Sequence, residues 1–262
     1  MIVEYHRPDS IEEAIKLLQR DLPTTYPLGG GTVLNRKSPE SYAVVDLQAL
    51  QLDRMITKGK YLQIGATVTL QDLHDGFSDD KRVVPNLPDD FKAAINLEGS
   101  YNLRQVATVA GTLVAGDGRS AFTTSMLAMD ATLILKPDDE VLKLGDLLPL
   151  REERLSGRVI IEVRIPTNIN FAYQYIARTP GDLAIVSIAI SRWPSGRTRV
   201  ALGGYSDAPL LAFDGTEPDG AEIAARDAFS MAEDEWASAG YRSEMAALLT
   251  SRCLKDIGAV NT

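Results

Sequence analysis

Apolar residues recur at helical spacing near the start of the chain, between Ile11 and Leu18. Ser10 precedes this run, and Glu13 follows three residues later, which is the spacing of a capping box. The pattern therefore predicts an N-terminal helix that begins after Ser10.

Strand-like and helix-like patterns then alternate over the first 150 residues. Short runs of β-branched and aromatic residues predict strands, whereas apolar spacing of three or four residues predicts helices. The predicted strands are Thr24–Leu28, Ala43–Asp46, Tyr61–Gly65, Val106–Ala110 and Ala131–Leu135. Helices are predicted from about Leu70, at Phe91–Leu97 and at Thr123–Met129, with an exposed loop at Asp75–Asp90. This alternation indicates an α/β arrangement.

The order changes after about residue 150, where strands come first and helices follow. The predicted strands are Arg158–Ile165, Phe171–Ala177, Ala184–Trp193 and Thr198–Leu202, with a hairpin turn at Pro194–Gly196. Two helices are predicted near Gly220–Ser238 and Tyr241–Ile257. Strands followed by helices indicate an α+β module, which begins near residues 150–168.

Composition and charge restrict the possible partners. The 262 residues carry a net charge of −9, so neither nucleic acid nor an anionic membrane surface is an expected partner. The apolar-leaning stretch Met126–Leu135 is too short to span a bilayer and contains Asp130. No signal sequence is visible, and we expect a cytoplasmic protein without a membrane span.

Metal and nucleophile chemistry have few candidate residues in this sequence. Cys253 is the single cysteine, and one thiol forms neither an internal disulfide nor an iron–sulfur site. His6 and His74 have no neighbours at metal-ligand spacing, so we expect no metal site. No G-x-S-x-G elbow is present, and we nominate no catalytic side chain.

Two glycine-containing segments are the strongest candidates for ligand binding. Gly29–Gly31 follow a predicted strand and precede Thr32, and glycine lets a backbone turn sharply and present its N–H groups to an anion. A second segment of similar character, Thr108–Thr112, suggests that the ligand carries a diphosphate. The alternative is that the glycines only form a tight turn. Neither G-x-G-x-x-G nor a P-loop fits, so phosphate would be held by loop amides and Thr32.

Several loose motifs in a fixed order carry a family resemblance. They are Tyr5-His6-Arg7-Pro8, Leu28–Thr32, Val45-Asp46-Leu47, Asn102–Gly111, Leu127–Ala131, Arg178, Asp182–Val186 and Arg199–Gly204. Through them nearly the whole chain resembles the FAD-binding middle subunit of the molybdenum hydroxylases. This family includes the medium subunit of aerobic carbon monoxide dehydrogenase and the flavin domain of xanthine dehydrogenase.

The resemblance implies an α+β fold in two parts. A PCMH-type FAD-binding domain of two α/β subdomains would occupy residues 1–165. A C-terminal α+β flavoprotein domain, with a small antiparallel sheet and helices, would occupy residues 166–262. The implied function is electron transfer from 2Fe–2S clusters of a small subunit through FAD to an external acceptor. Substrate would be hydroxylated in a large molybdopterin-binding subunit.

The resemblance also implies which residues contact FAD. The diphosphate cradle would be Leu28, Gly29, Gly30, Gly31, Thr32, Val33 and Leu34. The second segment would be Thr108, Val109, Ala110, Gly111 and Thr112, with hydroxyl donors at Thr32 and Thr108. Ile160 falls where the family places an aliphatic contact to the flavin ring.

Three positions depart from the family pattern. Ala110 replaces the first glycine of a Gly-Gly pair, and we expect an altered turn because alanine tolerates positive φ poorly. Ala121 replaces an aspartate that hydrogen-bonds the cofactor, and nearby Asp117 either substitutes for it or caps a turn. Gln174 replaces a lysine near the flavin ring. These departures motivate one alternative, a structural subunit with weak or no FAD. A standalone FAD oxidoreductase is a separate alternative, and the short C-terminal module argues against it.

Overall fold

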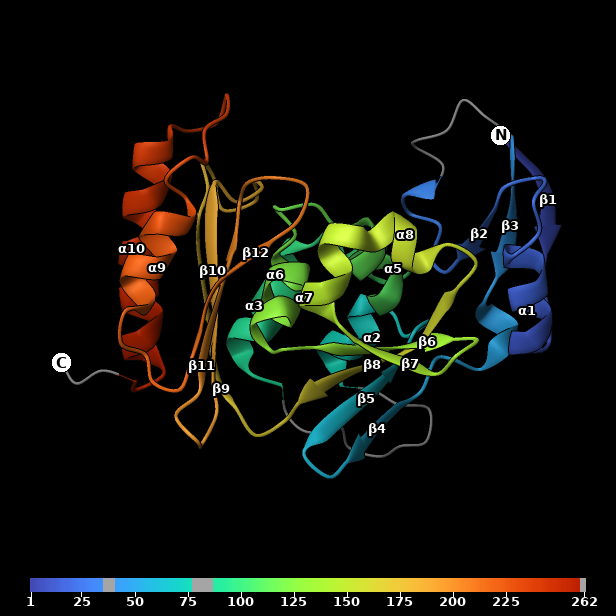
Figure 1. The fold of residues 1–262 in the computed structure, drawn as a ribbon, viewed down its shortest axis with the longest axis horizontal. Helices are drawn as coiled ribbons and strands as arrows, with labels where there is room; N and C mark the ends of the chain where they lie inside the picture. The colour runs from blue at the N-terminus through green and yellow to red at the C-terminus, as the bar shows by residue number, and fades with distance from the viewer. Residues whose placement is uncertain (35–40, 77–86, 260–262) are drawn as a thin grey trace. The chain divides into compact units, whose positions relative to one another are not determined.

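The computed structural model describes residues 1–34, 41–76 and 87–259, which fold as two compact units (Figure 1). Unit 1 comprises Met1–Pro85, Ser100–Ala115 and Thr132–Ile165. Unit 2 comprises Asn86–Gly99, Gly116–Ala131 and Pro166–Thr262. Helices and sheets are mixed in both units, which confirms the predicted α+β class. The division into functional domains at residues 165 and 166 stays a prediction.

Unit 1 begins with a three-stranded parallel sheet in the order β1-β3-β2. The strands are β1 (Ile2–His6), β2 (Thr25–Leu28) and β3 (Tyr42–Asp46). Helix α1 (Ile11–Leu18) connects β1 to β2 and packs on the sheet through Ala14, Ile15 and Leu18 (Figure 1). The backbone N–H of Glu13 donates to Ser10 Oγ at 3.2 Å, so the predicted start of this helix is confirmed.

A five-stranded sheet completes unit 1 in the order β4-β5-β8-β6-β7. Its strands are β4 (Met55–Lys58), β5 (Tyr61–Gly65), β6 (Thr132–Lys136), β7 (Glu140–Lys143) and β8 (Val159–Pro166). Besides α1, the described helical segments of this unit are η2 (Gln48–Leu50), α2 (Leu70–Asp75), α4 (Tyr101–Arg104), α5 (Val109–Ala115), α7 (Leu144–Leu147), η3 (Leu148–Leu150) and α8 (Arg151–Leu155).

Unit 2 is built on a four-stranded antiparallel sheet in the order β12-β11-β10-β9. The strands are β9 (Asn170–Ile176), β10 (Val186–Arg192), β11 (Thr198–Gly203) and β12 (Leu210–Gly215). Helices α9 (Ala221–Ala228) and α10 (Ala239–Asp256) cover one face, and α3 (Asp89–Leu97) and α6 (Ala121–Ala128) cover the other (Figure 1). Because both faces are covered, β10 is buried from Val186 to Ser191.

Two of the sequence-based predictions are wrong in secondary structure. Val106–Ala110 is not a strand: Thr69 and Thr108 form an isolated bridge, and helix α5 begins at Val109. The predicted helix Gly220–Ser238 ends at Ala228, and a loop follows in which Asp234 accepts the backbone N–H groups of Trp236 and Ala237. Strands β1, β4, β7 and β12 were not predicted. Most of the predicted loop Asp75–Asp90 lies outside the described residues.

Candidate functional site

The glycine loop, residues 29–34, leaves the carboxyl end of β2 in the parallel sheet of unit 1. Ligands of open parallel sheets bind at this edge. The loop is anchored at both ends: Leu47 N–H donates to the Leu28 carbonyl at 3.0 Å, and the Tyr42 hydroxyl donates to the Leu34 carbonyl at 3.0 Å. Gly31 has φ +67°, a left-handed conformation that glycine adopts at little cost.

The backbone N–H groups of this loop are available to a ligand. Within the described parts of the chain, none of the N–H groups of residues 29–33 donates a hydrogen bond to a protein oxygen. These residues are half-buried. Successive N–H groups that lack protein partners form the kind of concavity that binds anions. The loop thus has the donors that a diphosphate requires.

The two predicted glycine segments lie against each other. A Cβ built on Gly30 would lie 1.7 Å from the carbonyl oxygen of Val106, and one on Gly29 would lie 2.6 Å from Thr108 Oγ1. Real Cβ atoms do not approach this closely, so residue 30 must be glycine for the two backbones to pack together, whereas a Cβ at residue 29 would have to displace the Thr108 side chain. A structural role thus explains part of the glycine run: Gly31 forms the turn and Gly30 allows close packing. Neither role requires the N–H groups to lack protein partners.

The second segment has a different structure from the loop that we predicted. Val109 N–H donates to the Val68 carbonyl, Ala110 N–H donates to the Ala66 carbonyl, and Thr112 N–H donates to the Thr108 carbonyl. Gly111 N–H donates to Thr108 Oγ1 at 3.1 Å. Because these amides donate within the protein, they are not free to bind a ligand, and the segment contributes by packing against the glycine loop. Ala110 lies in helix α5 without a positive φ, and the expected alteration of the family turn stays a prediction.

Asp46, Tyr5 and Arg7 lie at the same carboxyl edge of the sheet. Asp46 is buried, and its Oδ1 accepts Gln48 N–H at 2.9 Å while its Oδ2 accepts the Tyr5 hydroxyl. This hydrogen bond, together with burial, raises the pKa of Tyr5. The Arg7 Nε atom lies 3.9 Å from Asp46 Oδ2. Sequence reasoning used these residues only as family markers and assigned them no role in the site.

Ile160 and Asp117 are the two predicted contacts that lie outside the glycine segments. Ile160 is buried in β8, where it pairs with Leu135 of β6. Asp117 is exposed in unit 2, and its Oδ1 accepts Arg119 N–H at 2.8 Å, so its carboxylate caps a turn. The proposed flavin contacts of Ile160 and Asp117 stay predictions.

Glu98 provides a carboxylate at the start of helix α6, beside Ala121, where the resemblance implies an aspartate. Ala121 is the first residue of this helix and is buried. Glu98 Oε2 accepts Phe122 N–H and the Ser120 hydroxyl, both at 3.0 Å. Burial raises the pKa of Glu98, although these hydrogen bonds oppose the shift. Sequence reasoning missed Glu98, because its distance of more than twenty residues from α6 gives no local signal.

Gln174, at the position where the resemblance implies a lysine, forms a hydrogen bond within unit 2. Its Nε2 donates to Asp256 Oδ2 at 2.6 Å, at the end of α10. A neutral amide at this position carries no charge that would stabilise an anionic ring. The position of Gln174 relative to the flavin ring stays a prediction.

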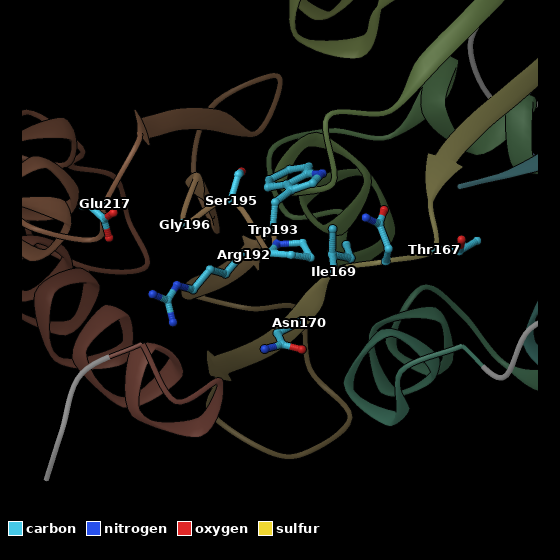
Figure 2. A pocket seen from close by; sticks show the side chains of 10 residues that line it. Thr167, Ile169, Asn170, Arg192, Trp193, Ser195, Gly196 and Glu217 are labelled. Atoms are coloured by element: carbon cyan, nitrogen blue, oxygen red, sulfur yellow. The ribbon is translucent and has the colours of Figure 1, made fainter. Parts of the chain in front are cut away.

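A polar cavity of about 670 Å³ lies in unit 2, between the residues that precede β9 and the β10–β11 turn (Figure 2). Asn168, Asn170, Arg192, Trp193 and Glu217 are among the side chains that line it. No predicted site residue does so. The volume of this cavity thus does not identify the site, which we assign to the glycine loop on its chemistry.

The described residues 1–34, 41–76 and 87–259 hold neither a metal-ligand cluster nor a membrane-spanning helix. No group of three or more His, Cys, Asp or Glu side chains there is arranged to hold a metal ion. None of the described helices is both long and apolar enough to cross a membrane.

Comparison with known proteins places this geometry in context. The family model described as "FAD binding domain in molybdopterin dehydrogenase" matches residues 1–168. YgfM of Escherichia coli K12 is 28% identical, and the alignment covers 98% of this chain and 96% of YgfM. The glyceraldehyde dehydrogenase medium chain of Sulfolobus acidocaldarius is 24% identical over 97% of both chains. The nicotine 6-hydroxylase medium subunit of Paenarthrobacter nicotinovorans is 27% identical over 98% of both.

Solved structures show the same fold along the whole chain. A chain of the reconstituted CO dehydrogenase from Oligotropha carboxidovorans superposes with a TM-score of 0.79 at 24% identity, covering 98% of both chains. A chain of quinoline 2-oxidoreductase from Pseudomonas putida 86 superposes with a TM-score of 0.76 at 23% identity, also covering 98% of both. At this identity the superpositions establish the fold alone.

Proposed function

The chain belongs to the family of FAD binding domains in molybdopterin dehydrogenases, and from this premise we propose that it passes electrons from a small 2Fe–2S subunit through FAD to an external acceptor. It is a flavoprotein subunit of an oxidoreductase of the molybdenum hydroxylase type, and its cofactor is FAD. The electron path and the identity of the partners are the parts that we propose.

The unpaired N–H groups of residues 29–33 are the observation that carries the proposal. FAD contains a diphosphate, and these groups would hold it by hydrogen bonds at the carboxyl edge of the parallel sheet. Tyr42 and Leu47 fix the two ends of the loop, so the donors are arranged before the ligand binds. Gly30 keeps the loop seated on the segment that contains Val106.

The residues of this chain bind and orient the cofactor without taking part in acid–base chemistry. When bound, FAD supplies the redox chemistry, accepting electrons and passing them on. The loop residues hold the diphosphate, and buried Ile160 is proposed as an aliphatic contact near the ring. We assign no catalytic side chain.

The proposed partners are a large molybdopterin-binding subunit and a small 2Fe–2S subunit. The relatives include proteins named as medium chains or medium subunits of a glyceraldehyde dehydrogenase, a nicotine hydroxylase and a carbon monoxide dehydrogenase, and such names imply further subunits. Cys253, the single cysteine, is fully buried, and burial raises the pKa of its thiol. A buried, protonated thiol ligates no cluster, which supports placing the clusters in another chain.

The absorbance spectrum of the purified chain, together with extraction of its cofactor, tests FAD binding. Bands of oxidised flavin and FAD in the extract are expected. Co-expression with an iron–sulfur subunit and a molybdenum subunit then tests the electron path: substrate should bleach the flavin in the complex and leave the isolated chain unchanged. Turnover of a small substrate by the isolated chain would replace this proposal with a standalone oxidoreductase.

A structural subunit without flavin is the second candidate function, and one observation favours it. The amides of Val109, Ala110, Gly111 and Thr112 are all used within the protein, so the loop at residues 29–33 supplies the backbone donors without help from them. A stable complex with both partners whose medium subunit contains no FAD would establish this alternative.

A further inference from the structure

The carboxyl ends of the three parallel strands bring Arg7, Asp46 and Gly29 to one edge of the sheet. Arg7 follows β1, Asp46 ends β3, and Gly29 follows β2. Because β3 lies between the other two strands and neighbouring strands are about 4.8 Å apart, Arg7 and Gly29 start roughly 10 Å from each other. An extended arginine side chain covers most of that distance.

Asp46 leaves the hydrogen-bonding groups of Arg7 largely unused. Both carboxylate oxygens of Asp46 already accept hydrogen bonds, from Gln48 N–H and from the Tyr5 hydroxyl. Arg7 approaches only through Nε at 3.9 Å, which is longer than a hydrogen bond, and its side chain is 56% exposed. Within the part of the chain that the structure describes, its terminal amino groups have no hydrogen-bond partner.

A cation at this edge would complement the charge of a diphosphate held by the glycine loop. The N–H groups of residues 29–33 are neutral donors, whereas a diphosphate carries negative charge and the buried carboxylate of Asp46 lies at the same edge. Arginine pairs with phosphate oxygens through a planar fork of donors. Resting on the proposed function, we propose that Arg7 binds the diphosphate of FAD directly. Arg7 would reach it from the end of β1, across β3 from the glycine loop at the end of β2.

The competing explanation is that Arg7 only offsets the charge of Asp46. Substitutions at both residues separate the two roles. If Arg7 acts through Asp46 alone, D46N should restore FAD affinity to an R7Q chain. If Arg7 contacts the diphosphate, the R7Q/D46N chain should remain weak.

The experiment titrates FAD-free protein with FAD and with riboflavin, which lacks the phosphates, at low and at raised salt. Wild type, R7Q, R7K, R7Q/D46N and the control K16Q are compared, with the thermal midpoint of each. Lys16 is an exposed cation on α1 of the same unit. R7Q should bind FAD roughly ten-fold or more weakly with a reduced salt dependence, because it lacks one charge-assisted contact.

The other measurements have defined outcomes. Riboflavin affinity should be the same in every variant, R7K should lie between wild type and R7Q, and K16Q should match wild type. Equal FAD affinity of R7Q and wild type, an equal loss for FAD and riboflavin, or recovery in R7Q/D46N would each overturn the assignment of Arg7. Failure of the wild type to bind FAD would instead overturn the proposed function together with this inference.

Discussion

Alanine in place of Gly30 tests whether the glycine loop depends on close backbone packing. The added Cβ would meet the Val106 carbonyl oxygen at 1.7 Å and the Val106 carbonyl carbon at 2.6 Å. Both atoms belong to the backbone, so no side chain can rotate away to relieve the clash. The loop and the segment beneath it must therefore move apart.

The size of that movement follows from the contact distance. Cβ atoms essentially never approach another heavy atom within 3.0 Å, so the 1.7 Å contact requires a displacement of at least 1.3 Å (3.0 minus 1.7). Overpacking of this kind costs about 1–3 kcal/mol. A shift above 1 Å also moves N–H groups out of hydrogen-bond range, because the useful N···O distances span only about 2.7–3.2 Å.

Two readouts check the expected result. Thermal unfolding followed by circular dichroism should show a midpoint lowered by a few degrees, since each 1 kcal/mol corresponds to about 2–4 °C in a chain of this size. The ratio of flavin to protein absorbance should fall to near zero in the purified G30A protein. Gly240, where a Cβ would meet nothing within 4 Å, provides the matched control G240A. This control should keep its full flavin content.

One result would refute the reasoning. If G30A unfolds at the wild-type temperature and retains its FAD, then residue 30 does not lie on the Val106 backbone as described. If G30A is less stable but keeps its full flavin content, the close packing is confirmed and the glycine loop does not bind the cofactor.

Three further substitutions test neighbouring features. Y42F removes the hydroxyl that holds the Leu34 carbonyl, so it should cost about 1 kcal/mol and lower FAD affinity in a titration. Burial raises the pKa of Glu98, so the protonated side chain stabilises the folded state and this stabilisation is lost as pH rises. The neutral side chain of E98Q should therefore raise the unfolding midpoint at about pH 7 and give no advantage at about pH 4. The hydrogen bond from Arg197 lowers the pKa of Asp214, so the ionised carboxylate stabilises the folded protein above the pKa of the unfolded chain, and this stabilisation is lost in acid. D214N should be less stable than wild type by about 1–2 kcal/mol at about pH 7 and equally stable at about pH 2.

The sequence predicted those helices and turns that depend on interactions between residues close together in the chain. Helix α1 follows from its apolar spacing and the hydroxyl of Ser10, and the β10–β11 hairpin follows from the turn at Pro194–Gly196. Strand β1 was missed because its residues are mostly exposed and its partner β3 lies more than thirty residues away. Pairing between distant segments gives no periodic signal along the chain.

The candidate site shows the same limit. The run Gly29–Gly31 is visible as a turn that presents backbone donors, and the structure places it at a parallel-sheet edge. The segment after Val106 was predicted as a strand because its residues favour that structure locally. Hydrogen bonds from Val109 and Ala110 to Val68 and Ala66 override this preference, and they arise only from the tertiary fold. Glu98 was missed for the same reason, because its hydrogen bonds to the start of α6 join residues that are far apart in the sequence.

Buried Arg242 explains why the helix after β12 stops early. Its guanidinium donates to the carbonyl groups of Ile185, Ala232 and Ala237 and to Asp234 Oδ1. These bonds hold the chain between α9 and α10 in a loop. An arginine in a predicted helix gives no indication from sequence that it will be fully buried.

The alternation of chain segments between the two units has a consequence for biosynthesis. Unit 2 takes α3 and α6 from the first half of the chain, while the strands they cover begin only after Pro166. During translation these helices emerge from the ribosome well before the strands of their sheet. The side chains of Phe91 and Phe122, which are buried in the folded protein, are therefore not yet covered by the sheet. A gene fragment that encodes residues 166–262 alone would lack both helices, and its product would expose one face of the sheet. Dissection of this protein at residue 166 is therefore expected to give an insoluble C-terminal piece.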